Sequence, residues 1–162
     1  MDDSGRWYDE VKVGDAFSRS ITITDTHLVL GAGLIGDFNP HHVNDEFAKG
    51  SRFGTRILHG MMTSALMGGA VGMYFHGTAV AYLEHSARFR APVRAGDTLT
   101  TTWTVVEVHD KPKHGGGVVV LNGVCRDQHG TIVAEADAKM LVQARATPAR
   151  ARTRQRGPVR GK

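Results

Sequence analysis

The polar residues best suited to chemistry lie in one short segment, Gly36-Asp37-Phe38-Asn39-Pro40-His41-His42. It holds one carboxylate and two imidazoles between two apolar stretches of the chain. An Asp/His pair exchanges protons with water near neutral pH, so Asp37 and His42 suit the addition of water to an activated double bond, or its removal. On a helix their five-residue spacing would separate the side chains by about 140°. A rigid turn through Pro40 could instead direct both at one point.

Other interpretations of these residues remain open from spacing alone. Asp37 and Asn39 are also typical of a capped turn, in which the histidines would lie on the surface. Metal ligands could also be drawn from Asp37, His41, His42 and His59, but no recognised ligand spacing is present, so we predict no metal site.

The elements that must position this segment follow from periodicity. Residues 16–24 alternate as in a half-buried strand, and a helix capped by Thr24 or Asp25 is expected to end at Gly36. Residues 44–49 predict one or two helical turns. A helix from about His59-Gly60 to Phe75 is small or apolar on every face, which predicts an enclosed helix.

After that helix the pattern changes to a period of two residues. Strands are predicted at 80–91, 97–109, 117–127 and 131–142, joined as an antiparallel meander. The expected fold class is therefore α+β, with an antiparallel sheet wrapped around a long central helix.

Several small residues have simple structural interpretations. Gly31 and Gly33 each cost about 1 kcal/mol inside a helix, which suggests a close neighbour. Gly115-Gly116-Gly117 predicts a hairpin loop rather than a phosphate cradle. The single cysteine, Cys125, is interpreted as a structural strand residue that cannot form an intrachain disulfide. The methionines Met61, Met62, Met67 and Met73 are expected in the core or along an acyl tunnel, with the core favoured.

The charge of the chain is concentrated at its C-terminal end. Seven of the 20 basic residues lie in the last eighteen positions, without an acid, so the formal net charge of +4 describes that segment. We expect one domain over 1–143 and a basic, disordered tail over 144–162, whose attraction to nucleic acid would be non-specific. No secretory signal is visible and the apolar stretch near 61–75 is too short to span a bilayer, so the expected location is cytoplasmic.

Three motifs carry a resemblance to a known family. The segment from Gly36 to His42 resembles the signature of the MaoC-like (R)-specific enoyl-CoA hydratases, which have the hot-dog fold. Ile57-Leu58-His59-Gly60-Met61 is similar to the family's opening of the central helix, and Phe89-Arg90-Ala91-Pro92-Val93 to its next strand and turn. The resemblance covers roughly residues 10 to 142.

The resemblance implies a role for each matched residue. Asp37 and His42 would activate the water that adds to a trans-2-enoyl thioester, with Asn39, Pro40 and His59 in support. The backbone N–H of Gly60 would bind the thioester oxygen, which agrees with the favourable field at a helix N-terminus. The family also implies a homodimer or higher homo-oligomer, a substrate carried on CoA or acyl carrier protein, and no metal or redox cofactor.

Two positions depart from the family pattern. Gly68 stands where many members have a serine, and His41 replaces the usual aliphatic residue before the catalytic histidine. A thioesterase on the same fold, with Asp37 as nucleophile or base, is the enzymatic alternative. A non-catalytic acyl-CoA binding module is the other alternative, and Gly68 is the feature that favours it.

Overall fold

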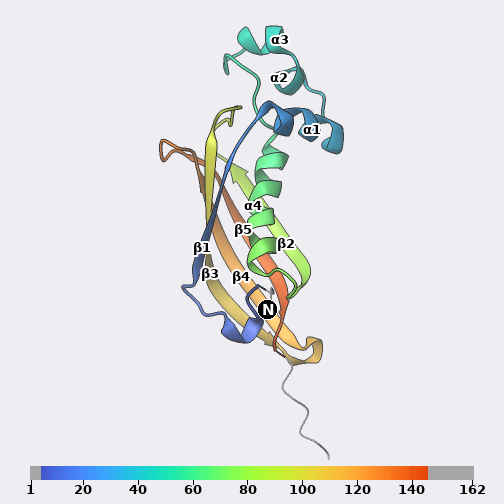
Figure 1. The fold of residues 1–162 in the computed structure, drawn as a ribbon, viewed down its shortest axis with the longest axis vertical. Coiled ribbons are helices and arrows are strands. Elements are labelled where there is room, and N and C mark those ends of the chain that lie inside the picture. Colours follow the sequence, from blue (N-terminus) through green and yellow to red (C-terminus); the bar gives the residue numbers. More distant parts are fainter. Residues whose placement is uncertain (1–4, 146–162) are drawn as a thin grey trace, which may run out of the picture.

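The computed structural model describes residues 5–145, which form one sheet, one long helix and several short helical segments (Figure 1). The strands are β1 (Ala16–Thr22), β2 (Ala79–Phe89), β3 (Thr98–Lys111), β4 (Gly116–Arg126) and β5 (Ile132–Gln143). The α-helices are α1 (Asp25–Ile35), α2 (Pro40–Val43), α3 (Asp45–Lys49) and α4 (Gly60–Tyr74), and the 3-10 turns are η1 (Tyr8–Glu10) and η2 (Pro112–His114). Of the predicted tail over 144–162, residues 146–162 lie outside the described residues, whereas Ala144 and Arg145 donate backbone hydrogen bonds to Gly115 and Asp9 and so belong to the domain.

The sheet is antiparallel, with the strand order β1-β3-β4-β5-β2. The prediction of a four-strand meander was therefore wrong for β2, because only β3, β4 and β5 follow one another in space. The β2 strand instead pairs with β5, the last strand in the sequence, and forms one edge of the sheet. Sequence periodicity identifies a strand but not its partner, since pairing depends on the path of the chain around α4.

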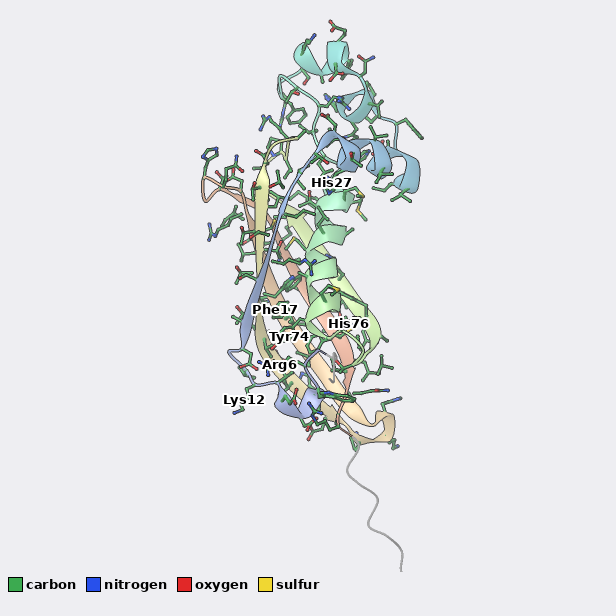
Figure 2. All side chains as sticks on the ribbon, viewed as in Figure 1. Arg6, Lys12, Phe17, His27, Tyr74 and His76 are labelled. Atoms are coloured by element: carbon green, nitrogen blue, oxygen red, sulfur yellow. The ribbon has the colours of Figure 1, made fainter. Side chains whose placement is uncertain are left out.

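Helix α4 lies against the concave face of the sheet (Figure 1). Its contact with β3 is fixed by Trp103, which is fully buried and donates its Nε1–H to the carbonyl of Met67 at 3.0 Å. A Cβ at Gly123 would lie 2.7 Å from the Trp103 ring, so the glycine makes room for the indole. At the far end of α4, the Tyr74 ring stacks on Phe17 of β1 with centroids 3.9 Å apart (Figure 2).

The prediction that α4 is enclosed on all sides was wrong for the single chain. One stripe of the helix is exposed, with Met61 at 63% and Met73 at 52% of their full accessibility, whereas Met67 is fully buried. The sheet covers only one side of the helix, and no element of the described chain covers the opposite side. The methionines are therefore divided between core and surface.

The short helices α1, α2 and α3 gather beyond the N-terminal end of α4 (Figure 1). Helix α1 ends where predicted, because Gly36 adopts a left-handed conformation with φ of 78° and donates its N–H to the carbonyl of Ala32. Gly31 lets α1 approach α4, since a Cβ there would lie 2.8 Å from Met62 and 2.9 Å from His59. Gly33, in contrast, has no neighbour within 4 Å of such a Cβ. Within residues 5–145, no helix has the length and apolar character needed to cross a membrane.

Candidate active site

The segment between α1 and α2 is held in shape by its own polar side chains. Oδ1 of Asp37 accepts the N–H of Asn39 at 3.0 Å, and Oδ1 of Asn39 accepts the N–H of His41 at 3.2 Å. Asn39 is thereby the N-cap of α2, and its extended conformation (ψ of 133°) is the one that a following proline favours. Pro40 is the first residue of α2, where a missing N–H costs nothing. The sequence predicted the turn but not the helical turn that carries His42.

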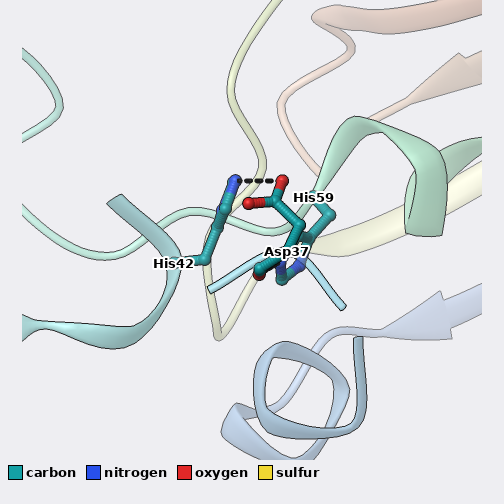
Figure 3. Close-up of side chains that lie close together, drawn as sticks. All are labelled: Asp37, His42 and His59. Atoms are coloured by element: carbon teal, nitrogen blue, oxygen red, sulfur yellow. Dashed lines mark hydrogen bonds and ion pairs between the residues drawn. The ribbon is translucent and has the colours of Figure 1, made fainter. Parts of the chain in front are cut away.

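Asp37 and His42 face each other across this turn (Figure 3). Nδ1–H of His42 donates to the carbonyl of Ile57 at 2.8 Å, because a carbonyl oxygen only accepts. In the neutral ring Nε2 then carries the lone pair, and it lies 3.8 Å from Oδ2 of Asp37. That separation is too long for a direct hydrogen bond, but suits two groups that share a bridging water.

The exposure of the two side chains differs. The Asp37 side chain is 49% exposed and that of His42 is 13% exposed, so the carboxylate opens to solvent while the imidazole is held by the protein. A water between them would be supplied from the surface and oriented from the His42 side.

His59 connects this pair to the start of α4. It is 2% exposed, its Nε2–H donates to the backbone carbonyl of Asp37 at 2.8 Å, and its ring stacks on the His42 ring with centroids 3.8 Å apart. The backbone of Asp37, the ring of His42 and the first turn of α4 are thus held by one side chain. Nδ1 of His59 is buried beside α1 and has no hydrogen-bond partner among the described residues.

Asp37, His42 and His59 also form a group that has the composition of a metal site, since one possible ligand atom of each lies within 4.8 Å of the others. Their hydrogen bonds leave one nitrogen of each ring free, as in a metal-bound histidine. The ring geometry opposes this use, because stacked rings tilted by only 26° do not direct their remaining lone pairs at a common ion.

Gly60 is the first residue of α4 and lies directly after His59. The first N–H groups of a helix have no partner within it, so this end offers donors and a positive field to an oxygen atom. A Cβ at Gly60 would lie 3.1 Å from the Phe89 ring, so the close packing of β2 also requires a small residue here. The sequence analysis did not identify Phe89 as the neighbour of Gly60, because the two residues lie in segments that are distant in the chain.

A hollow of about 340 Å³ adjoins Gly60. Its lining includes Ile57 and Leu58 before the helix, Phe89 at the end of β2, and the side chains of Arg52 and Arg90. Asp37 and His42 do not line it, so the pair and the hollow flank the start of α4. A thioester whose oxygen is bound at Gly60 would lie between the two.

His41 points away from this pair. Its ring makes edge contacts with Phe47 and Phe53, at centroid distances of 4.9 and 5.2 Å. Its N–H and carbonyl are also bound, to Asn39 and to the N–H of Ile57. The contacts of His41 therefore hold the α2–α3 segment against the loop before α4.

The strand order and the helix seated on the sheet define the hot-dog fold, an α+β class. A model of the family described as the MaoC like domain matches residues 10–124. The (R)-specific enoyl-CoA hydratase of Rhodospirillum rubrum is 35% identical over 139 residues, which cover 86% of this chain and 93% of the relative. The unliganded R-hydratase PhaJ1 of Pseudomonas aeruginosa superposes with a TM-score of 0.75 at 31% identity, covering 85% of this chain and 86% of that one. The chain belongs to the MaoC-like domain family.

A further relative is named a dehydratase rather than a hydratase. The 3-hydroxybutyryl-CoA dehydratase of Methylorubrum extorquens is 33% identical over 102 residues, which cover 63% of this chain and 65% of the relative. Hydration and dehydration are opposite directions of one reaction, so the two names describe the same type of chemistry.

Proposed function

We propose that this chain is a hydratase or dehydratase that interconverts trans-2-enoyl and (R)-3-hydroxyacyl thioesters. The observation that carries the proposal is the gap of 3.8 Å between Nε2 of His42 and Oδ2 of Asp37, with His42 oriented by its bond to Ile57. The names of the relatives reported above support the same reaction.

In the forward direction the oxygen of the bound water forms a bond to C3 of the enoyl group. The Asp37/His42 pair accepts one proton of that water, and a proton returns from the pair to C2, so one water is consumed and the pair is unchanged. As the C2–C3 double bond is lost, negative charge develops on the thioester oxygen. The N–H of Gly60 and the field of α4 stabilise this charge.

The proposed reaction uses only side-chain and backbone groups, so we propose that no metal or redox cofactor takes part. The thioester would be carried on CoA or on an acyl carrier protein, and the arginines beside the hollow suit a phosphorylated carrier of either kind. The cytoplasmic location stays a prediction from the sequence.

We also propose that the chain acts as a homodimer or higher homo-oligomer. The β2 strand is an edge strand whose Val80, Leu83 and Phe89 are 49%, 52% and 48% exposed, and its Tyr82 borders the same hollow as the exposed Met61 of α4. An apolar sheet edge next to an apolar helix stripe favours pairing with a second copy. Light scattering at several protein concentrations tests this, and a monomer at all of them would contradict it.

The reaction is tested with trans-2-butenoyl-CoA and the purified protein. We expect loss of the enoyl thioester absorbance, a product one water heavier, and no release of free thiol. Release of free CoA would instead identify a thioesterase. Tight binding of the thioester without turnover would identify a binding module.

A further inference from the structure

A second polar pair lies on the inner face of β2, away from Asp37 and His42. The Tyr82 hydroxyl and Nδ1 of His85 are 2.9 Å apart. In a regular strand residues three apart point to opposite faces. Here the register shifts between Tyr82 and Glu84, so that Tyr82 pairs with Met140 and His85 with Ala138, which are both buried on the inner face. The bulge at Leu83 therefore brings both side chains to the side that faces α4.

This pair borders an open hollow of about 320 Å³ along α4, whose lining shares Met61 with the face proposed above to pair with a second copy. The helix contributes Met61, Ser64, Ala65 and Gly68 to its lining. Gly68 leaves space opposite the pair, since a Cβ there would make only ordinary contacts, at 3.6 Å from the Tyr82 hydroxyl and 3.9 Å from the His85 ring.

The pair is neutral and lacks one hydrogen-bond partner. Burial raises the pKa of Tyr82 to about 12 and lowers the pKa of His85 below its ordinary value. Nε2 of His85 is buried and has no hydrogen-bond partner within residues 5–145. A buried polar nitrogen without a partner costs free energy, which a ligand atom in the hollow would recover.

We propose that Tyr82 and His85 form a specificity site for a neutral oxygen on the acyl chain of the substrate, such as a hydroxyl or a keto oxygen. With the Tyr82 hydroxyl donating to Nδ1, the proton of the neutral His85 ring is on Nε2, and a small shift of the ring toward the hollow would present this N–H to that oxygen. A neutral pair favours a neutral oxygen over a carboxylate, because it offers no countercharge for the hydration that a carboxylate would lose on binding.

The inference rests on the proposed function, because it takes Gly60 as the position of the thioester oxygen. Gly68 lies eight residues further, about 12 Å along the helix axis. An extended chain gains about 1.3 Å per bond, so the pair would meet an atom about nine bonds from the thioester carbon. The substrate class is therefore a medium-chain enoyl thioester with an oxygen function well beyond C3.

The experiment compares medium-chain trans-2-enoyl-CoAs that differ only in one hydroxyl at successive positions beyond C3, with trans-2-butenoyl-CoA as a substrate too short to reach the pair. We expect one hydroxyl position to raise kcat/KM about tenfold over the unsubstituted chain.

Tyr82→Phe and His85→Leu should remove that preference and leave butenoyl-CoA hydration unchanged. Gly68→Ser should remove it too, by placing a hydroxyl of the protein in the same space. Tyr74→Phe, the same change at the far end of α4, is the matched control.

Each result bears on a different claim. Absence of butenoyl-CoA hydration by the wild-type protein would overturn the proposed function itself. Hydration of all chains without a preferred hydroxyl position, or a preference that survives both substitutions, would overturn the specificity site. A uniform loss on every substrate together with a change of oligomeric state would show that the pair serves an interface between copies, and would also overturn it.

Discussion

The ring of His59 stacks on the ring of His42 with centroids 3.8 Å apart, while its Nε2–H holds the backbone carbonyl of Asp37. One buried side chain thus touches both members of the candidate catalytic pair. We therefore interpret His59 as a positioning residue, which orients Asp37 and His42 but does not exchange protons with the substrate.

Replacement of His59 tests whether it only positions the pair. His59→Leu removes the donor and the stacked ring, and we expect kcat to fall about 10- to 100-fold with little change in KM, because a small displacement of a catalytic group is costly. His59→Gln retains an N–H donor for the Asp37 carbonyl and should recover part of the rate. The pH profile of kcat should keep both of its limbs in His59→Leu. Loss of one limb would show instead that His59 exchanges protons with the substrate.

Asp37 and His42 are expected to act as one unit. Because both hold the same water, Asp37→Asn or His42→Ala alone should reduce hydration about 100-fold or more, and the double variant should lose little beyond the larger single loss. Circular dichroism provides the control for folding, since Asp37 also caps the turn through Asn39. Strictly multiplicative losses would rule out the shared water.

The N–H of Gly60 can be removed without changing the helix start. Position N1 favours proline, and His59 already has the extended conformation (φ −58°, ψ 135°) that a following proline requires. Because Phe89 lies against Gly60, the test uses a Phe89→Leu background. We expect Gly60→Pro to lose about 100-fold in kcat, as for an oxyanion donor, and Gly60→Ala, which keeps the N–H, to lose much less. Equal losses in the two variants would place the thioester oxygen elsewhere.

Two truncations of the chain, which differ only in whether Arg145 is kept, should differ in stability. The Arg145 guanidinium pairs with Glu10 at 2.8 Å and lies over the Trp7 ring at 5.3 Å. Removal of residues 146–162 should leave the melting temperature and the hydration rate unchanged, as the composition of that segment predicts. Removal of Arg145 as well should lower stability slightly, measured as a shift of the denaturant midpoint. A large loss from the first truncation would contradict the prediction of a disordered tail.

The environment of the Tyr8 phenol predicts a loss of folding stability at alkaline pH. Burial, together with its hydrogen bond to Asp110 at 2.7 Å, raises the pKa of Tyr8 from 10.0 to about 12. Folding thus favours the protonated phenol, so its contribution is present below about pH 10 and is lost as the pH rises through about 12. Between these values the free energy of unfolding should fall less steeply in Tyr8→Phe than in the wild type. Parallel curves would contradict the contribution.

The sequence alone determined the elements and the segment that carries the candidate pair. Gly36 ends α1, Pro40 marks the turn after it, and the period-two pattern after Gly77 marks four strands to within a few residues. These features depend on local backbone preferences, which residues close together in the chain express without help from the rest of the fold. The motif residues could therefore be named from the sequence, with their roles left as predictions.

Tertiary structure alone decided which groups meet. The pairing of β2 with β5, the bond from His42 to the Ile57 carbonyl and the contact of Phe89 with Gly60 all join segments that are distant in sequence. The approach of Tyr82 to His85 depends on a single bulged residue in a strand that reads as regular. Pairing register and the packing of α4 on the sheet set these distances. Both follow from the whole folded chain, and no local pattern encodes them.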